Sequence, residues 1–347
     1  MHPIKDYYCI GDLHSAALVA KDTSMDWLCL PHFDSQMIFS KILDDTKGFW
    51  KLDIPQKSKV YSRYNKHLPI ICFDIKKQNK TLFKLHDYMI PREEVECAHH
   101  KIVRKIVAHS KTKITFTLPV DKKIKKKKKK KDKYFFSDFI LHIPSSWQCD
   151  IQKQSKKTTF TISGKIQKGS EYEVHFEYSK NKKHTPENSL KQVENYWSNW
   201  LKQGDFSKFS SKKIRDHVIR SVIILKLMQF YPTGAIVAAP TTSLPEGIGS
   251  TRNWDYRYTW IRDATFTLYA LYVVGYKQEA IDFFSFIETI LKKNHLDLMY
   301  TIKGKKVPKE KTLNNYSGYK NSQPVRVGNS ASDQYQLDTY GSLIDAY

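Results

Sequence analysis

The chain has 347 residues, of which 40% are hydrophobic and 27% are charged. This ordinary globular composition excludes a wholly disordered chain, a collagen and a small disulfide scaffold. Lys and Arg exceed Asp and Glu by 23 charges, but ten of the lysines lie in the run 122–133. The remaining excess is scattered lysine, which does not by itself indicate binding to nucleic acid.

Residues 7 to about 180 predict short β-strands with one buried face. Polar residues alternate with branched or aromatic ones, which is the period of a half-buried strand. Turn signals at 163–164 and 168–170 separate the runs. Because no helical pattern intervenes, we expect an antiparallel β-sandwich. The clearest strand candidates are 70–75, 113–118, 158–162 and 172–178.

The lysine run 122–133 is the one low-complexity segment. Seven consecutive lysines, 125–131, repel one another and resist burial. We expect a solvated, mobile loop between two strands. The alternative is a patch that binds polyanions, but the run contains no Arg and no aromatic residue, which nucleic-acid patches usually include. We therefore expect no nucleic-acid partner.

The period becomes helical after about residue 186. Segment 186–210, with Trp197 and Trp200, predicts a linker helix. An apolar stripe spaced by three and four predicts a helix over 214–228. Further helices are expected over 260–274, with Gly275 after its end, over 280–291, and from about 330 to 347. The predicted domains are a sandwich over 1–185, the linker helix, and an incomplete helical domain over 211–347.

The cysteine pattern and the hydropathy of the sequence indicate the cellular compartment of the protein. Five widely spaced cysteines without a CxxC motif predict reduced thiols and no zinc site. No apolar run approaches the ~20 residues that span a bilayer, and the N-terminus has no apolar signal core. We expect a cytoplasmic protein with no membrane partner, no metal and no cofactor; its oligomeric state is left open.

Segment 252–263 concentrates aromatic and charged side chains. Pyranose rings stack on Trp and Tyr, and their hydroxyls pair with carboxylates and guanidinium groups. The segment therefore suggests a sugar site, whereas the alternative is an aromatic packing corner with an Arg–Asp ion pair. Its members are Arg252, Trp254, Asp255, Tyr256, Arg257, Tyr258, Trp260, Arg262 and Asp263.

A long loop, 238–249, precedes this segment, and long loops in compact domains are often functional. Glu246 is its one carboxylate, so it is a candidate catalytic group. The favoured interpretation is a loop carboxylate that is tied to a backbone N–H or to an arginine.

Segments 241–246, 252–258, 260–264 and 267–271 resemble the signature of glycoside hydrolase family 15, which includes glucoamylases, glucodextranases and bacterial-type trehalases. Segments 10–12, 16–19, 24–31 and 33–35 resemble the trehalase-like N-terminal domain of that group. Segments 318–329 and 336–341 add a third match. Three separate motifs in the order of the family make the resemblance specific.

The resemblance implies a β-sandwich, a linker helix and an (α/α)₆ barrel. It also implies cleavage of α-linked glucosides with inversion, by one glutamate that protonates the leaving group and a second that activates water. When the roles of the family are transferred to the matching positions, the resemblance implies substrate binding by Tyr256, Trp260, Arg262 and Asp263. Arg326, Gln336 and Asp338 lie in matched segments, and for Arg326 and Asp338 a structural pairing role is an equal alternative.

The catalytic glutamates of the family lie C-terminal to every motif found here. The Gly-Ile-Trp-Glu type segment does not occur, and the last glutamate is Glu310. The catalytic residues are therefore unassigned, and we expect the N-terminal part of such an enzyme, which alone does not hydrolyse α-glucosides. The alternatives are a non-catalytic remnant that binds sugar or acts as an interaction module, and a polyanion-binding protein.

Overall fold

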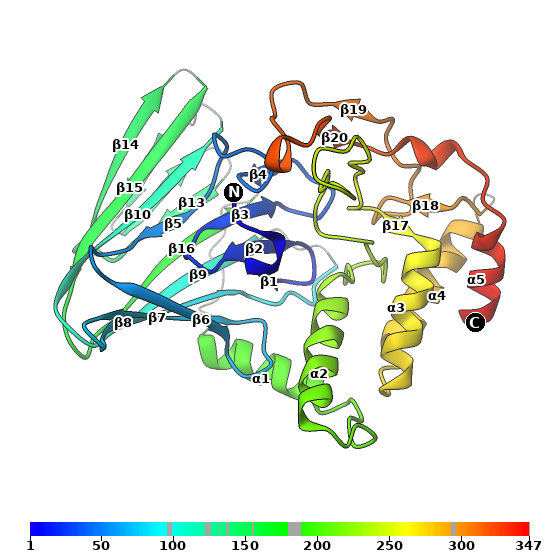
Figure 1. The fold of residues 1–347 in the computed structure, drawn as a ribbon, viewed down its shortest axis with the longest axis horizontal. Coiled ribbons are helices and arrows are strands. Elements are labelled where there is room, and N and C mark those ends of the chain that lie inside the picture. The colour runs from blue at the N-terminus through cyan, green and yellow to red at the C-terminus, as the bar shows by residue number, and fades with distance from the viewer. Residues whose placement is uncertain are drawn as a thin grey trace.

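The computed structural model describes residues 1–95, 99–121, 126–130, 132–136, 139–154, 156–179, 189–292 and 296–346. A β-rich region is followed by helices, as the sequence predicts (Figure 1). The last strand of the β-rich region ends at Ser179, and the first α-helix begins at Leu190. No helix in the described ranges is long and apolar enough to cross a membrane.

In its described residues, the β-rich region contains three antiparallel sheets, and all four strand candidates are confirmed. The eight-stranded sheet has the order β11 (Lys126–Lys130), β12 (Lys133–Phe136), β13 (Phe139–His142), β16 (Glu171–Ser179), β9 (His99–Ala108), β8 (Lys80–Met89), β7 (Ile71–Lys77) and β6 (Lys59–Tyr64). A four-stranded sheet has the order β14 (Gln148–Gln154), β15 (Lys157–Ile166), β10 (Thr112–Val120) and β5 (Lys51–Asp53). A second four-stranded sheet contains β1 (Tyr7–Gly11), β2 (Ala16–Ala20), β3 (Met25–Cys29) and β4 (Met37–Phe39).

One continuous apolar core joins these sheets. Phe73 and Phe83 from the eight-stranded sheet and Phe116 from a four-stranded sheet are fully buried in it. The alternation of apolar and polar residues explains this, because successive strand side chains point to opposite faces. The core also holds one ion pair, in which Arg104 Nη2 lies 2.7 Å from Asp87 Oδ2.

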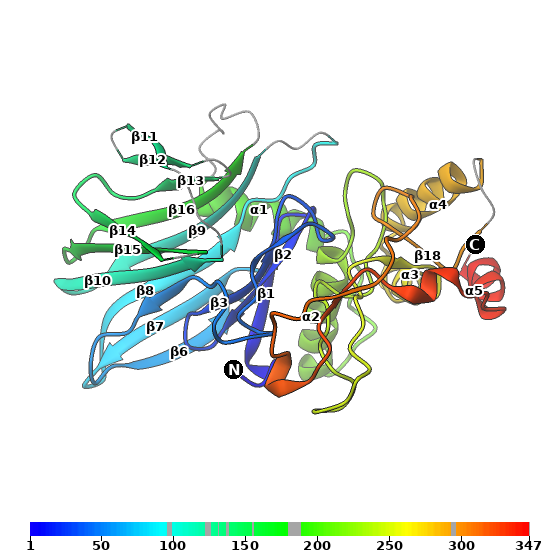
Figure 2. The same ribbon diagram turned by 90° about the horizontal axis from the view of Figure 1, so that it is seen from above.

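Two local predictions in the β-rich region are wrong. Gly164 lies inside β15 rather than in a turn; a Cβ there would be 2.2 Å from the ring of Trp147, so the glycine permits close packing. The expected lysine loop contains β11, whose backbone pairs with β12 at the edge of the eight-stranded sheet (Figure 2). Lysine is a common edge-strand residue because its charge opposes further pairing. Residues 122–125 and 131 of that run lie outside the described residues.

The helical region begins with α1, at the position of the predicted linker helix. Ser189 caps α1 and forms a capping box with Gln192. The helices predicted over 214–228, 260–274 and 280–291 are confirmed, and Gly275 has a φ of 98° after the third helix. The α-helices are α1 (Leu190–Leu201), α2 (Lys212–Leu227), α3 (Ile261–Val273), α4 (Gln278–Leu291) and α5 (Asp338–Ala346). The described ranges also contain the 3₁₀ helices Ile4–Asp6, Tyr319–Asn321 and Ser330–Asp333. Their short strands are β17 (Thr259–Trp260), β18 (Met299–Tyr300), β19 (Lys311–Thr312) and β20 (Arg326–Val327).

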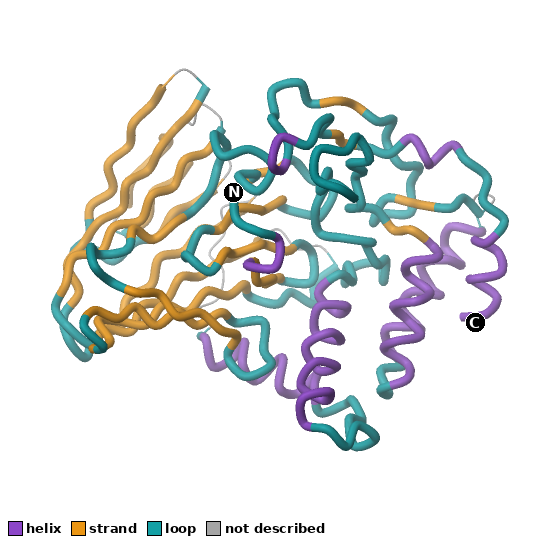
Figure 3. Tube along the Cα trace, viewed as in Figure 1, coloured by secondary structure: helices purple, strands orange, loops and turns teal. Residues whose placement is uncertain are grey.

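The last helix begins later than predicted. Segment Ser330–Asp333 is a 3₁₀ turn that Asn329 caps, and Gln334 then has extended backbone angles. The α-helix starts only at Asp338, where a carboxylate favours the helix N-terminus. Figure 3 shows α3, α4 and α5 on the side of the molecule away from the large sheets, whereas α1 lies beneath the strands.

A second apolar core spans the junction between strands and helices. It joins Leu13 and Ile70 from the β-rich region to Ile223 of α2 and Phe283 of α4. A hydrogen bond from Trp27 Nε1 to the carbonyl oxygen of Pro240, 2.7 Å long, also crosses the junction. The loop that precedes the aromatic segment is therefore fixed against the β-rich region.

Candidate functional site

Segment 253–260 runs extended beside residues 238–243. Three backbone hydrogen bonds hold it there: Ser243 N to Trp254 O, Ala239 N to Tyr256 O, and Ala238 N to Tyr258 O, between 2.8 and 3.0 Å. Because side chains alternate along extended backbone, the segment divides into two faces. One face is buried and contains Asn253, Asp255 and Arg257, whereas Trp254 and Tyr256 on the other are partly exposed.

The buried face is structural. Arg257 donates from Nε and Nη2 to the two carboxylate oxygens of Asp255, at 2.8 and 2.7 Å. Its Nη1 also donates to the carbonyl oxygen of Ser35 in the β-rich region, 2.9 Å away. Burial opposes the charge of Arg257, but Asp255 outweighs it and raises the pKa of Arg257 well above its usual value. For Asp255 and Arg257, the structure thus matches the alternative interpretation of the segment, a packing corner with an Arg–Asp ion pair.

The start of α3 carries the polar cluster that the sequence predicts. Trp260 is the N-cap residue, and Arg262 and Asp263 lie in the first turn. Arg262 Nη1 lies 2.7 Å from Asp338 Oδ2 at the start of α5, and its Nε lies 3.8 Å from Asp263 Oδ2. The guanidinium carbon is 5.7 Å from the ring centre of Trp260. We call Tyr256, Trp260, Arg262, Asp263 and Asp338 the α3 cluster.

The α3 cluster is half-exposed and electrostatically coupled. The side chains of Arg262, Asp263 and Asp338 are 40%, 44% and 46% exposed. Partial burial raises the pKa of Asp263, and the nearby Arg262 opposes this shift. The hydrogen bond to Asp338 raises the pKa of Arg262. One guanidinium thus lies between two carboxylates, with donors, acceptors and an indole ring open to a ligand.

Tyr256 lies within electrostatic reach of the other members. Burial raises the pKa of its hydroxyl, and the negative charges of Glu246 and Asp263 add to the shift. Arg262 acts in the opposite direction. The phenol therefore remains protonated at neutral pH and can donate a hydrogen bond.

Two other predicted site residues lie in different surroundings. Arg326, in β20, pairs with Glu310 Oε1 at 2.8 Å and donates to the carbonyl oxygen of Thr251 at 2.7 Å. Its guanidinium carbon is 4.7 Å from the ring centre of Trp254. These contacts give Arg326 a role in holding the aromatic segment. Gln336 donates to Gln334 Oε1 at 3.1 Å, within its own segment.

The loop carboxylate is tied as the favoured interpretation predicts. Glu246 Oε2 lies 3.0 Å from Arg252 Nε, and its backbone N–H donates to the carbonyl oxygen of Arg252. Both side chains are exposed, at 42% and 70%. Glu246 therefore closes the surface loop rather than standing as an unpaired carboxylate.

Sequence reasoning missed one feature at the junction with the β-rich region. Asp34 and Lys311 line a cavity there, although the chain separates them widely. Asp34 lies in the matched segment 33–35, but the sequence gives no sign that it meets Lys311, because the two segments come together only in the fold.

With this geometry in place, comparison with known proteins gives two family matches. Residues 212–347 match the model of glycosyl hydrolases family 15, and residues 1–123 match the trehalase-like N-terminal model. The matched models thus place a glycosyl hydrolase family 15 region after a trehalase-like N-terminal region. Both matches agree with the two family resemblances that the sequence motifs predict.

The relatives are curated proteins of greater length. The chain is 32% identical to a protein named trehalase from Thermoplasma volcanium, over 97% of this chain and 55% of that protein. It is 30% identical to a trehalase from Mycolicibacterium smegmatis, over 99% of this chain and 55% of that one. The chain thus spans about half the length of the curated relatives that it matches. A putative kojibiose phosphorylase from the human microbiome aligns with a TM-score of 0.43 and 12% identity, over 88% of this chain and 51% of that one.

Proposed function

We propose that this chain is the substrate-holding part of an α-glucoside hydrolase and that the α3 cluster binds the terminal glucose. The observation that carries the proposal is the position of Arg262, between Asp263 and Asp338 and beside Trp260. Sugar hydroxyls both donate and accept, so they can bond to the carboxylates and to the guanidinium at once. The indole ring offers an apolar face to the C–H side of the pyranose.

The proposed reaction is hydrolysis with inversion. A water molecule attacks the anomeric carbon while a base takes its proton, and an acid protonates the departing glycosidic oxygen from the other side. In the described part of the chain, the carboxylates beside the α3 cluster each contact an arginine: Asp263 and Asp338 contact Arg262, and Glu246 contacts Arg252. We therefore assign these groups to binding and leave the acid and the base unassigned.

We propose trehalose as the substrate. The support is that the curated relatives, from both archaea and mycobacteria, are named trehalases. A chain that binds glucose through the α3 cluster could also accept maltose, because both sugars present a terminal α-linked glucose. The two are separated by comparing the affinities of the protein for each disaccharide.

We further propose that α2 to α5 form part of an (α/α)₆ barrel. The support is the apolar surface of α3, on which Phe266 and Tyr269 are each 68% exposed and Tyr272 is 59% exposed. Surfaces of this kind usually mark contacts with other protein segments. Further helices of a barrel would cover them.

The experiment is titration calorimetry of trehalose against the wild type and Asp263→Asn, with exposed Asp150→Asn as the matched control. Loss of a charged hydrogen bond costs about 1.5–3 kcal/mol, which weakens binding by more than about tenfold. Asp150→Asn should bind as the wild type does. The thermal midpoint of Asp263→Asn should stay close to that of the wild type, because the side chain is half-exposed.

Two results would count against the proposal. Equal trehalose affinity in Asp263→Asn and the wild type would remove this residue from the site. A lower thermal midpoint with unchanged affinity would instead support the packing-corner alternative.

A further inference from the structure

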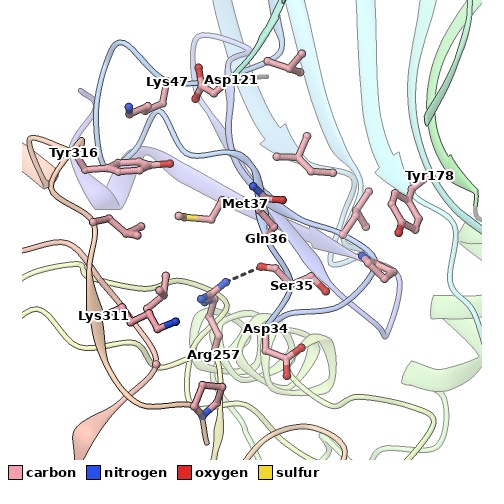
Figure 4. Close-up of a pocket in the computed structure, with 18 of the residues that line it drawn as sticks. Asp34, Ser35, Gln36, Met37, Lys47, Asp121, Tyr178, Arg257, Lys311 and Tyr316 are labelled. Atoms are coloured by element: carbon pink, nitrogen blue, oxygen red, sulfur yellow. Dashed lines mark hydrogen bonds between the residues drawn. The ribbon is translucent and has the colours of Figure 1, made fainter. Parts of the chain in front are cut away.

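A cavity of about 1020 Å³ lies where the β-rich region meets the loops around β19 and β20. We call it the junction pocket. Its volume is at the upper end of the ~300–1,000 Å³ range typical of ligand sites. Figure 4 shows residues Asp34 to Met37 on one side and Tyr316 and Lys311 on the other. The pocket is lined on both sides of the junction, so its shape depends on both regions.

The junction pocket is separate from the α3 cluster. Arg257 and Tyr258 line it, and Arg257 belongs to the buried face of the extended segment. None of the five members of the α3 cluster lines the pocket. A ligand in the pocket would therefore leave the α3 cluster free.

The pocket contains a carboxylate that lacks a donor from another residue. In the described ranges of the chain, no other residue donates a hydrogen bond to the Asp34 side chain. Burial raises the pKa of Asp34, and the charges of Arg257 and Lys303 oppose that shift. The backbone N–H of Asp34 itself also stabilises the charged carboxylate. Because no other residue donates to it, this partly desolvated carboxylate can accept a hydrogen bond from a ligand hydroxyl.

Two lysines of the junction pocket are also available to contact a ligand. Lys309 and Lys311 form no ion pair with any described residue and are exposed at the rim. Lys47 lies 4.4 Å from the ring centre of Tyr316, so its cation covers one ring face. Asp121 accepts from the backbone N–H of Gly48 at 2.9 Å. Donors and acceptors are thus interspersed around the opening.

This mixture favours a neutral ligand with many hydroxyl groups. Because Arg257 is already paired with Asp255, the charged groups that line the pocket and can contact a ligand are three lysines and the two carboxylates of Asp34 and Asp121. An anion would be attracted to the lysines but repelled by both carboxylates, whereas hydroxyls can donate to the carboxylates and accept from the ammonium groups. Apolar side chains, including Met37 and Leu313, also line the cavity and can contact the C–H faces of a sugar ring.

We propose that the junction pocket is a second saccharide site, which binds a short neutral oligosaccharide independently of the α3 cluster. The volume accommodates more than one sugar ring. Occupancy would bridge the segment Asp34–Met37 and the loop with Lys311, and so tie the β-rich region to the region after α4. The proposal does not depend on the chain being a hydrolase.

Met37 provides a local probe, because its methyl group lies in a side chain that lines the pocket. The experiment records methyl spectra of protein labelled with ¹³C-methyl methionine during titration with maltotriose, and Met37→Leu assigns the signal. The protein has six methionines, so the other five serve as internal references. We expect a saturable shift of the Met37 signal, with at least about tenfold weaker binding in Asp34→Ala and in Lys311→Ala.

Matched variants separate this site from the α3 cluster. Exposed Lys80→Ala should leave the titration unchanged, and so should Asp263→Asn, even if Asp263→Asn alters trehalose binding. Absence of a Met37 shift with maltotriose would overturn the proposal. A shift produced by citrate but not by maltotriose would also overturn it and would make the pocket an anion site.

Discussion

Removing the carboxylate of Asp255 should destabilise the whole molecule, although Asp255 lies only eight positions before Asp263 in the sequence. Asp255 is fully buried and accepts from Arg257 and from the backbone N–H of Gly328. The variant Asp255→Ala leaves the guanidinium of Arg257 buried without its partner. Breaking a buried pair in this way costs about 3–5 kcal/mol.

The magnitude can be followed as a shift of the thermal midpoint. At about 2 °C per kcal/mol for a chain of this size, the midpoint should fall by about 6–10 °C. Half-exposed Asp263→Ala is the matched control and should remain within the roughly ±0.5 kcal/mol that is usual for surface changes. Scanning calorimetry or circular dichroism at pH 7 measures both variants.

A double variant distinguishes the unpaired charge from a general packing defect. Asp255→Ala with Arg257→Leu removes the buried cation, so it should be less destabilised than Asp255→Ala alone. An Asp255→Ala midpoint within about 1 °C of the wild type would refute the assignment of this pair to the structural face.

Two further predictions concern stability. Burial lowers the pKa of His32 to about 3, and the positive charge of Lys303 adds to this shift. The pKa of histidine in the unfolded chain is about 6.5. The unfolded state therefore takes up the proton first, and the stability of the folded state falls as the pH drops from about 6.5 towards 3. The midpoint loss between pH 7 and pH 4.5 should be larger in the wild type than in His32→Leu, whereas exposed His109→Leu should match the wild type; equal losses in all three would contradict this. A Cβ at Gly164 would be 2.2 Å from the Trp147 ring, so Gly164→Ala should cost about 1–3 kcal/mol in urea unfolding. Gly341→Ala, where a Cβ meets nothing within 4 Å, should be neutral or stabilising; a neutral Gly164→Ala would refute the packing argument.

Sequence periodicity predicted the order of strands and helices because both patterns come from local alternation of polar and apolar side chains. Sequence periodicity gave the wrong local structure where tertiary contacts, rather than local sequence, determine the backbone conformation. Gly164 is typical of a turn but lies in β15 because Trp147 packs against it. The lysines 126–130 are typical of a loop, yet their backbone pairs with β12.

The candidate site was predictable in part. The residue types of Trp260, Arg262 and Asp263 already indicated a polyhydroxyl ligand, and the start of α3 brings them together. Sequence could not separate them from Asp255 and Arg257, because the two faces arise only when residues 253–260 pair with 238–243. The junction pocket was hidden for a similar reason, since its walls meet only in the folded chain.

The central claim, that the α3 cluster holds a terminal glucose, is tested most directly by a crystal structure of the protein soaked in trehalose. The account predicts a glucose ring against Trp260, with its hydroxyls within hydrogen-bond distance of Arg262 and Asp263. An α3 cluster without sugar at a saturating trehalose concentration, with Arg262 still bound only to its carboxylates, would contradict the claim.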